Sequence, residues 1–157
     1  MLYKIYTDGS ALGRTPNYIG GWGAVVVKDD VEVSSLTGSK FPATNNEMEL
    51  TALLESLKYA IELYKNGEAT EIEIYTDSAY SLNSITDWMY KWAVNGWVNS
   101  KKQPVANIEI MKEFYSLLSF PIPYIKFKKV KGHIGDTFNE RADDLATDSS
   151  AKLKLEL

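Results

Sequence analysis

Several stretches of the chain alternate apolar and polar residues with a period of two, which is typical of β-strands. They span residues 2–8, 20–27, 31–40, 71–76 and 124–130 and are rich in β-branched and aromatic side chains. Asp29 and Asp30 lie between the second and third stretches and predict a hairpin turn. The first three strands are therefore expected to form an antiparallel meander.

Between these strands, apolar residues recur at a period near 3.6, which indicates helices. The longest predicted helix begins at a capping box, with Thr44 as N-cap and Glu47 reaching back to it. Its apolar stripe contains Leu50, Leu53, Leu54, Leu57, Ala60, Ile61 and Tyr64, and it ends at Asn66-Gly67. Further helices are expected over 78–85, 87–94, 108 to about 118 with Asn107 as N-cap, and 139 to about 149. We interpret residues 1–150 as a single domain and residues 151–157 as a C-terminal tail open to fraying.

Four acidic residues stand out against this pattern. Asp8 and Asp77 each end a predicted strand, and if these strands are parallel neighbours both carboxylates lie where open α/β sheets bind ligands. Glu49 lies at the border of the long helix's apolar stripe, from which it can reach the sheet edge without being buried unpaired. Asp143 flanks the stripe of the last helix, whereas Asp144 points away from it. Clustered carboxylates repel one another unless a cation neutralises them, and their hard oxygens suit Mg²⁺ or Mn²⁺.

Each of these acids also has an ordinary structural interpretation. An Asp at a strand end is commonly a turn or cap residue. Glu49 alone could be a solvated helix residue, and Asp143 could be a first-turn acid that the helix dipole favours. The combination of all four favours a shared site. A calcium-binding structural domain would favour a compact Asp-x-Asp-x-Asp-Gly loop, which the sequence lacks.

Composition narrows the possible classes only a little. The 157 residues suffice for one domain with a core, and 45% hydrophobic and 24% charged residues are ordinary for a globular protein. The chain contains no cysteine, which excludes disulfides, a thiolate nucleophile and cysteine-ligated zinc. No stretch is long enough to span a membrane, and the chain start runs directly into the first strand, so no signal peptide is expected.

Charge gives a mixed indication. The net charge of −4 argues mildly against nucleic-acid binding. Lysines nevertheless gather at two places, Lys126, Lys128, Lys129 and Lys131 around the last strand and Lys101 and Lys102 in a polar loop. These lysines could contact a polyanion or could simply form a solvated face.

The acidic residues lie within short motifs that occur in a recognisable order. The motifs are Tyr6-Thr7-Asp8-Gly9-Ser10, Thr44-Asn45-Asn46-Glu47-Met48-Glu49-Leu50, Tyr75-Thr76-Asp77-Ser78-Ala79-Tyr80, Lys131-Gly132-His133 and Asn139-Glu140-Arg141-Ala142-Asp143-Asp144-Leu145-Ala146. With a predicted strand or helix at each, they resemble the motifs of type 1 ribonuclease H over residues 2 to about 150. The segment from Trp88 and Trp92 to Asn107 resembles the basic protrusion, or handle, of the bacterial members.

The resemblance implies a fold, a reaction and a cofactor. The fold would be ribonuclease H-like α/β, with a five-stranded mixed sheet in which strands one to three are antiparallel and strands one, four and five are parallel, flanked by helices. The reaction would be endonucleolytic hydrolysis of the RNA strand of RNA–DNA hybrids, leaving 5′-phosphate and 3′-hydroxyl ends. Such enzymes use two Mg²⁺ ions ~4 Å apart, with Mn²⁺ as a substitute, to activate a water and stabilise the leaving 3′-oxygen. We expect a cytoplasmic monomer.

The resemblance also implies residue roles. Asp8 would bridge both ions, and Glu49 and Asp77 would hold the ion on the leaving side. Asp77 would also help Asp143 to hold the ion beside the attacking water. Glu49 would contact the 2′-hydroxyl, which DNA lacks, and His133 would shuttle a proton or help products leave. Substrate-binding roles would fall to Arg14, Thr44, Asn45, Asn46, Trp88, Trp92, Lys101 and Lys102.

The chain departs from the family pattern where substrate is bound. Arg14 stands where an Asn often contacts the minor groove, Ala79 stands where a Gln often does, and Ala93-Val94-Asn95 replaces a strongly basic stretch of the handle. Two alternative functions remain open. A non-catalytic hybrid-binding module would normally lack at least one of the four acids. Another nuclease, transposase or resolvase core of the same superfamily would lack the Thr-Asn-Asn-x-Met-Glu-Leu and handle-like motifs.

Overall fold

The computed structural model describes residues 1–13, 18–119, 122–130 and 137–157. Its centre is a five-stranded sheet in the order β3-β2-β1-β4-β5. The strands are β1 (Leu2–Leu12), β2 (Ile19–Lys28), β3 (Val31–Lys40), β4 (Glu71–Thr76) and β5 (Ile125–Lys129). β2 pairs antiparallel with β1 and β3, whereas β4 pairs parallel with β1 and β5. This arrangement confirms the predicted mixed sheet.

The first strands differ from the prediction in length but not in their turn. The sequence pattern predicts that β1 ends at Asp8, but its pairing with β2 continues until Leu12 faces Ile19. Asp8 therefore lies inside the strand rather than at its end. The turn between β2 and β3 is as predicted, because Asp29 and Asp30 have φ of 53° and 61°, the left-handed pair of a two-residue hairpin turn.

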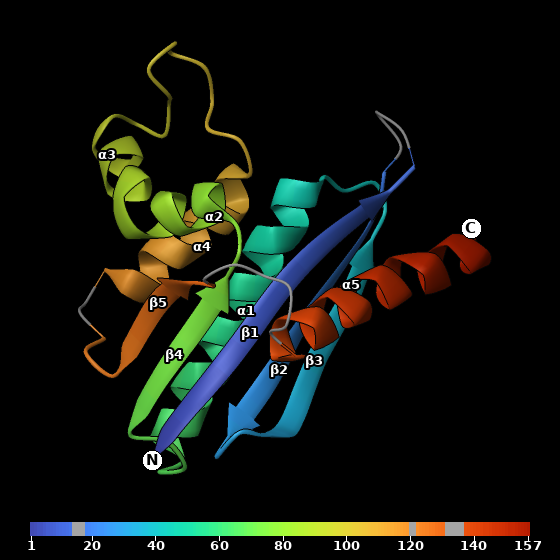
Figure 1. Cartoon of the computed structure of the whole chain (residues 1–157). Helices are drawn as coiled ribbons and strands as arrows, with labels where there is room; N and C mark the ends of the chain where they lie inside the picture. The colour runs from blue at the N-terminus through green and yellow to red at the C-terminus, as the bar shows by residue number, and fades with distance from the viewer. Residues whose placement is uncertain (14–17, 120–121, 131–136) are drawn as a thin grey trace.

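Helices cover both faces of the sheet (Figure 1). α1 (Asn45–Lys65) packs on one face against β1, β2 and β4, and its buried leucines form the main core with isoleucines of β1 and β4. α5 (Thr137–Glu156) crosses the other face over β1, β2 and β3. Gly21 and Gly23 permit this contact, because a Cβ at these positions would come within 2.2 Å and 2.5 Å of α5 atoms.

α5 extends further than the sequence predicts. The expected helix end near Ser149 is wrong, because the helix continues to Glu156, while fraying of residues 151–157 stays a prediction. Ser150 is fully buried, and Ser149 shares a hydrogen bond with Thr37 of β3. Packing against the β2–β3 hairpin therefore supports the last turns, and helical periodicity alone did not indicate it.

The helices after β4 also differ from the prediction. α2 (Ala79–Asn83), the π-helical turn η1 (Ser84–Trp88) and α3 (Met89–Val94) follow one another without a gap, whereas the sequence predicts two separate helices. The hydroxyls of Ser84 and Thr86 donate hydrogen bonds of 2.8 Å and 2.7 Å to carbonyl oxygens four residues earlier. Such side-chain bonds compete with the helix backbone and often bend it, which fits a widened turn at this point.

The last helix of this group is α4 (Ile108–Leu118), which packs against α1 and α3. Asn107 occupies the predicted N-cap position with a left-handed φ of 57°, but its side chain makes no capping hydrogen bond. The segment between α3 and α4 projects away from the sheet (Figure 1) and contains a bridge between Val98 and Pro104. Within the described ranges, none of the helices combines the length and apolarity needed to cross a membrane.

Candidate active site

Asp8 lies in the middle of the sheet, opposite Gly23 of β2. Its side chain is buried, and one carboxylate oxygen accepts a 2.9 Å hydrogen bond from the backbone N–H of Gly9. Gly9 is required here because a Cβ at this position would lie 2.4 Å from the backbone nitrogen of Glu49. The Asp-Gly pair therefore lets α1 approach β1 closely and brings Glu49 next to Asp8.

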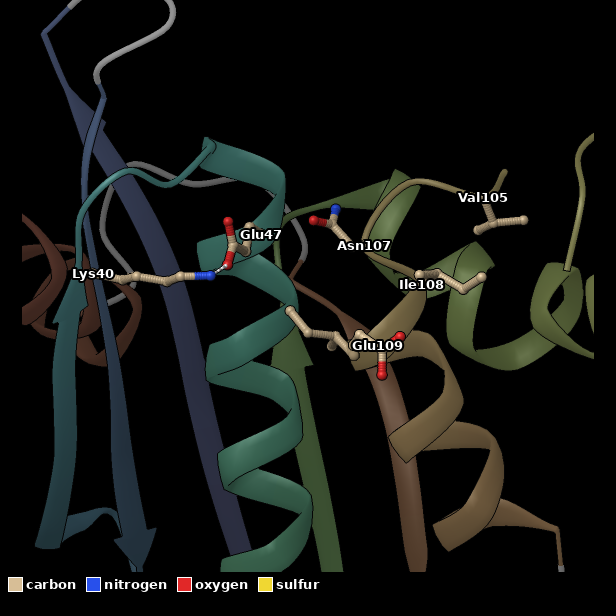
Figure 2. Close-up of a pocket in the computed structure, with 7 residues that line it drawn as sticks. Lys40, Glu47, Val105, Asn107, Ile108 and Glu109 are labelled. Atoms are coloured by element: carbon tan, nitrogen blue, oxygen red, sulfur yellow. Dashed lines mark hydrogen bonds and ion pairs between the residues drawn. The ribbon is translucent and has the colours of Figure 1, made fainter. Parts of the chain in front are cut away.

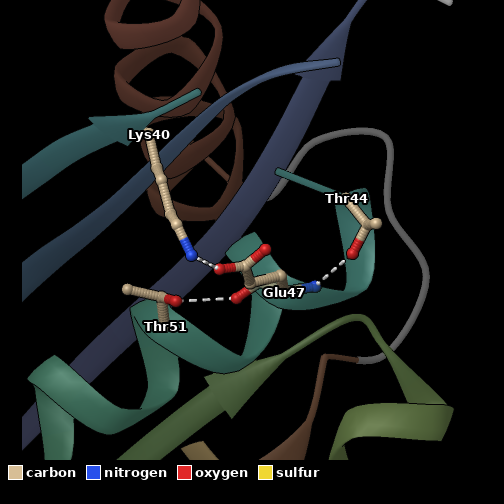
Figure 3. A network of polar contacts seen from close by, with 4 residues as sticks. All are labelled: Lys40, Thr44, Glu47 and Thr51. Carbon is tan, nitrogen blue, oxygen red and sulfur yellow. Dashed lines mark hydrogen bonds and ion pairs between the residues drawn. The ribbon is translucent and has the colours of Figure 1, made fainter. Parts of the chain in front are cut away.

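Polar contacts at the start of α1, shown in Figure 3, fix the helix that carries Glu49. Thr44 caps the helix as predicted, because its hydroxyl accepts a 3.1 Å hydrogen bond from the backbone N–H of Glu47. The carboxylate of Glu47, predicted to reach back to Thr44, instead forms an ion pair with Lys40 at the end of β3. The backbone carbonyl of Glu47 accepts a 2.7 Å hydrogen bond from the Thr51 hydroxyl. These contacts tie the first turns of α1 to the sheet.

Asp8, Glu49 and Asp77 form a compact acidic cluster. One carboxylate oxygen from each lies within 4.8 Å of the other two. Asp77 directly follows β4 and is exposed, whereas Glu49 is only 5% exposed. This burial differs from the expected border position of Glu49, because the close contact between α1 and Gly9 covers the side chain.

Burial and mutual repulsion raise the pKa of two of these carboxyl groups. Desolvation, a hydrogen bond with Asp143 and the charge of Asp77 raise the pKa of Asp8 from 3.8 to about 7. Desolvation, followed by the charges of Asp8 and Asp77, raises the pKa of Glu49 well above its ordinary value. The Oε2 atom of Glu49 is buried without a hydrogen-bond partner. Among the described residues no Lys or Arg forms an ion pair with these three acids, and a divalent cation would relieve their repulsion.

The donor set fits such a cation. Three carboxylates supply hard oxygen ligands of the type that Mg²⁺ and Mn²⁺ prefer. Asp143 follows the buried Ala142 on α5 and is itself exposed. It does not belong to the compact group of three, although its interaction with Asp8 contributes to the raised pKa of Asp8. Three of the four predicted acids thus lie together, with Asp143 outside the compact group, and the roles of all four as ligands stay predictions.

The other predicted site residues are placed less completely. Thr44, Asn45 and Asn46 are exposed at the start of α1, one turn before the helix presents Glu49 to the cluster. Arg14 and His133 lie outside the described residues, so the roles predicted for them stay predictions.

The handle segment forms a surface hollow beside Trp92. The hollow has a volume of about 610 Å³ and is lined by Lys91, Trp92, Asn95, Val98, Asn99, Ser100 and Lys102. Trp88 lies between Tyr80 and Trp92, with ring centroids 5.7 Å and 6.1 Å away. Lys101 and Lys102 are exposed. Lysines next to aromatic rings suit a nucleic-acid strand, because the cations attract phosphate and the rings stack with bases.

A second hollow separates the start of α1 from the start of α4, and the sequence analysis missed it. Figure 2 shows Lys40 and Glu47 on one side and Asn107 and Glu109 on the other. The hollow has a volume of about 370 Å³. Asn107, which lines this hollow, was the available signal in the sequence. Asparagine is one of the few residues that readily adopt the left-handed conformation, and Asn107 adopts it where the chain enters α4.

The sequence analysis also missed three aromatic rings near the acids. Tyr6 stacks with Tyr75 and with Phe138 at centroid distances of 4.9 Å and 5.6 Å. Tyr6 and Tyr75 each precede a site aspartate by two residues. The repeated Tyr-Thr-Asp sequence was the available signal, because residues two apart on a strand lie on the same face.

Comparison with known proteins identifies relatives along almost the whole chain. The family model RNase H matches residues 2–151. Ribonuclease H of Ehrlichia chaffeensis is 42% identical over 142 residues, which cover 90% of each chain. Ribonuclease H of Syntrophomonas wolfei is 42% identical over 150 residues, which cover 95% of this chain and 96% of the relative.

Solved structures show the same likeness. The RNase H domain of prototype foamy virus has a TM-score of 0.79 and 28% identity, and the match covers 96% of this chain and 94% of that domain. The foamy viral protease-reverse transcriptase in complex with an RNA/DNA hybrid has a TM-score of 0.81 and 26% identity. That match covers 96% of this chain but only 20% of the longer viral chain.

Proposed function

The chain belongs to the RNase H family, and we propose that it hydrolyses the RNA strand of RNA–DNA hybrids with two divalent metal ions. The observation that carries the proposal is the cluster of three carboxylates within 4.8 Å, in which Glu49 Oε2 has no protein partner. A structural relative was solved with an RNA/DNA hybrid, which supports the choice of substrate. The oxygen-only donor set favours Mg²⁺, with Mn²⁺ as a substitute.

In this proposal the carboxylates hold and orient the ions. Asp8 serves both ions, since it is the group that interacts with Glu49, Asp77 and Asp143 alike. Glu49 and Asp77 hold the ion on the leaving side, and Asp77 and Asp143 hold the other. When bound, such ions supply Lewis-acid activation of water and neutralise charge on the leaving 3′-oxygen. Because the 3′-oxygen is the leaving group, this hydrolysis leaves 5′-phosphate and 3′-hydroxyl ends.

The cluster has a buried side and an exposed side. Asp8 and Glu49 are buried, whereas Asp77 and Asp143 face solvent. The substrate phosphate therefore approaches from the side of Asp77 and Asp143, and the buried pair keeps its orientation without substrate. Glu49 contacts the RNA 2′-hydroxyl in this arrangement, and His133 moves a proton or assists product release.

Hybrid binding is assigned to two surfaces, the start of α1 and the handle. The exposed residues at the start of α1 contact the minor groove, where RNA displays its 2′-hydroxyls. The handle contacts the backbone through its lysines and aromatic rings. The assigned residues are Arg14, Thr44, Asn45, Asn46, Trp88, Trp92, Lys101 and Lys102. A monomeric state and a cytoplasmic location stay predictions.

The test is a panel of labelled duplexes in Mg²⁺. We expect cleavage of the RNA strand in the hybrid, no cleavage of RNA–RNA or DNA–DNA duplexes, and RNA fragments that begin with a 5′-phosphate. Tight hybrid binding without any cleavage would instead indicate a non-catalytic binding module. Cleavage of the DNA duplex would indicate another nuclease of the superfamily.

A further inference from the structure

A row of three aromatic rings lies beside the acidic cluster. Tyr6 of β1 is at the centre, stacked with Tyr75 of β4 at 4.9 Å between centroids and 10° between ring planes. On its other side Tyr6 stacks with Phe138 of α5 at 5.6 Å and 30°. Tyr6 is buried, and Tyr75 and Phe138 are half-buried. We refer to Tyr75, Tyr6 and Phe138 as the aromatic row.

The aromatic row joins the three elements that carry Asp8, Asp77 and Asp143. Tyr6 and Tyr75 face each other in the parallel register of β1 and β4 and form its last pair. Asp8 follows Tyr6 by two residues on the same strand, and Asp77 follows Tyr75 by two residues, just past the end of β4. The two ring contacts therefore span the two junctions, β1–β4 and β1–α5, on which the spacing of these carboxylates depends.

A buried carboxylate fixes the outer end of the row. The Tyr75 hydroxyl donates a 2.8 Å hydrogen bond to Glu73 Oε1, and Lys128 of β5 donates a 2.6 Å hydrogen bond to Glu73 Oε2. The hydrogen bond from Lys128 lowers the pKa of Glu73, which keeps this carboxylate ionised as an acceptor. Tyr75 is thus held at its ring by Tyr6 and at its hydroxyl by Glu73.

We propose that the aromatic row is a positioning element of the metal site, which holds β4 and α5 against β1 so that Asp77 and Asp143 stay next to Asp8. The proposal rests on the proposed metal-dependent function. Its physical basis is that the site carboxylates repel one another, while Asp77 lies beyond the last β1–β4 pair and so outside that backbone ladder. Ring stacking at Tyr6–Tyr75 opposes that separation at the last β1–β4 pair, beside the 2.8 Å hydrogen bond that the Thr7 hydroxyl donates to the Tyr75 carbonyl.

Tyr75→Leu tests the row at its half-buried end. Groups that support metal ligands commonly change metal affinity by 10–100-fold when they are replaced, and we expect the dissociation constant for Mg²⁺ to rise by about 10-fold. Tyr75→Phe keeps the stack and removes the hydroxyl that bonds to Glu73, so it should recover most of the affinity. The measurement is calorimetric titration of the metal-free protein with Mg²⁺ in the absence of nucleic acid. Unfolding in urea with EDTA is measured on the same variants.

The molecule offers a matched control in a second stack. Tyr64 of α1 and Tyr124 lie 3.6 Å apart between centroids, with 4° between their planes. Tyr124 immediately precedes β5, whose first residue pairs with Ile72 near the start of β4, so this stack is at the end of the β4–β5 pair remote from Asp77. Tyr124→Leu should lower stability but leave Mg²⁺ affinity unchanged.

Three outcomes would overturn the proposal. If Tyr75→Leu bound Mg²⁺ as tightly as the wild type, the aromatic row would have no role in positioning the metal ligands. If Tyr124→Leu lost as much Mg²⁺ affinity as Tyr75→Leu, the loss would be a consequence of general destabilisation and not of the aromatic row. No Mg²⁺ binding by the wild-type protein would overturn the metal site itself and, with it, the proposed function. Should Tyr75→Leu fail to fold, Phe138→Leu carries the same test at the α5 end of the row.

Discussion

Asp8→Asn is expected to stabilise the metal-free protein while it abolishes cleavage. The pKa of Asp8 is raised from 3.8 to about 7 in the folded state, chiefly by burial. Between these two values the folded state binds more protons than the unfolded state, so the free energy of unfolding of the wild type falls as pH rises. The amide of the substituted side chain cannot ionise, and its oxygen can still accept the hydrogen bond from Gly9. The variant therefore avoids this loss.

The magnitude follows from the shift. One pKa unit corresponds to about 1.4 kcal/mol, so ionisation of Asp8 costs the folded state at most about 4 kcal/mol. Part of that cost is shared with Glu49 and relieved by relaxation, and we expect a gain of about 1–3 kcal/mol at about pH 8. The gain should disappear well below pH 3.8, where the wild-type carboxyl is protonated in both the folded and the unfolded state.

Urea unfolding in EDTA across this pH range measures the gain by linear extrapolation. Asp144→Asn, which changes the neighbouring exposed acid of Asp143, is the control and should not show a pH-dependent gain. Saturating Mg²⁺ should reverse the order of stability, because in the proposed site only the wild type offers the Asp8 carboxylate to the ion. A variant less stable than wild type at high pH, or a gain that does not depend on pH, would refute the electrostatic reasoning.

Three further predictions concern other parts of the protein. His133→Ala should slow turnover by about 10²-fold or less, at the low end for general acid–base catalysis; single-turnover kinetics should not show the complete loss expected of Asp8→Asn. Replacing Lys101 and Lys102 together by Ala should weaken hybrid binding and reduce the log–log salt slope by about 1 to 2, with the rate at saturating substrate unchanged, as a salt series can check. Glu73→Gln should lower the free energy of unfolding by about 1 kcal/mol near neutral pH, because the Lys128 hydrogen bond lowers the pKa of Glu73. This last effect should fade in urea titrations as acid protonates Glu73, and an effect that persists in acid would contradict it.

The sheet and the acidic residues could be predicted because they depend on local patterns. Period-two alternation is enough to locate β3 and β4. The turn was predicted from Asp29 and Asp30, and in the structure both residues have the left-handed backbone of a hairpin turn. The preference for Asp143 over Asp144 needed only the helical period. In the structure the interaction of Asp143 with Asp8 helps to raise the pKa of Asp8, while its role as a ligand stays a prediction.

The features that escaped prediction depend on contacts between elements. Glu49 is at the border of a helical stripe, and it is buried because Gly9 lets α1 come close to β1. The last turns of α5 persist because Gly21 leaves room for Ser150 against β2. Neither contact could be predicted from the periodicity of a single segment, because each joins residues from two different elements. Asn107 was assigned as a cap on residue type alone, whereas the chain uses its left-handed backbone.

The central claim is that the carboxylate cluster holds the ions that cleave the RNA strand. The most direct measurement is single-turnover cleavage of a labelled RNA–DNA hybrid in Mg²⁺ by Asp8→Asn and Asp144→Asn, beside the wild type. These are the same conservative change at the centre of the cluster and outside it. We predict no detectable cleavage by Asp8→Asn and nearly normal cleavage by Asp144→Asn, with both variants folded. Cleavage by Asp8→Asn at a rate near that of the wild type would contradict the account.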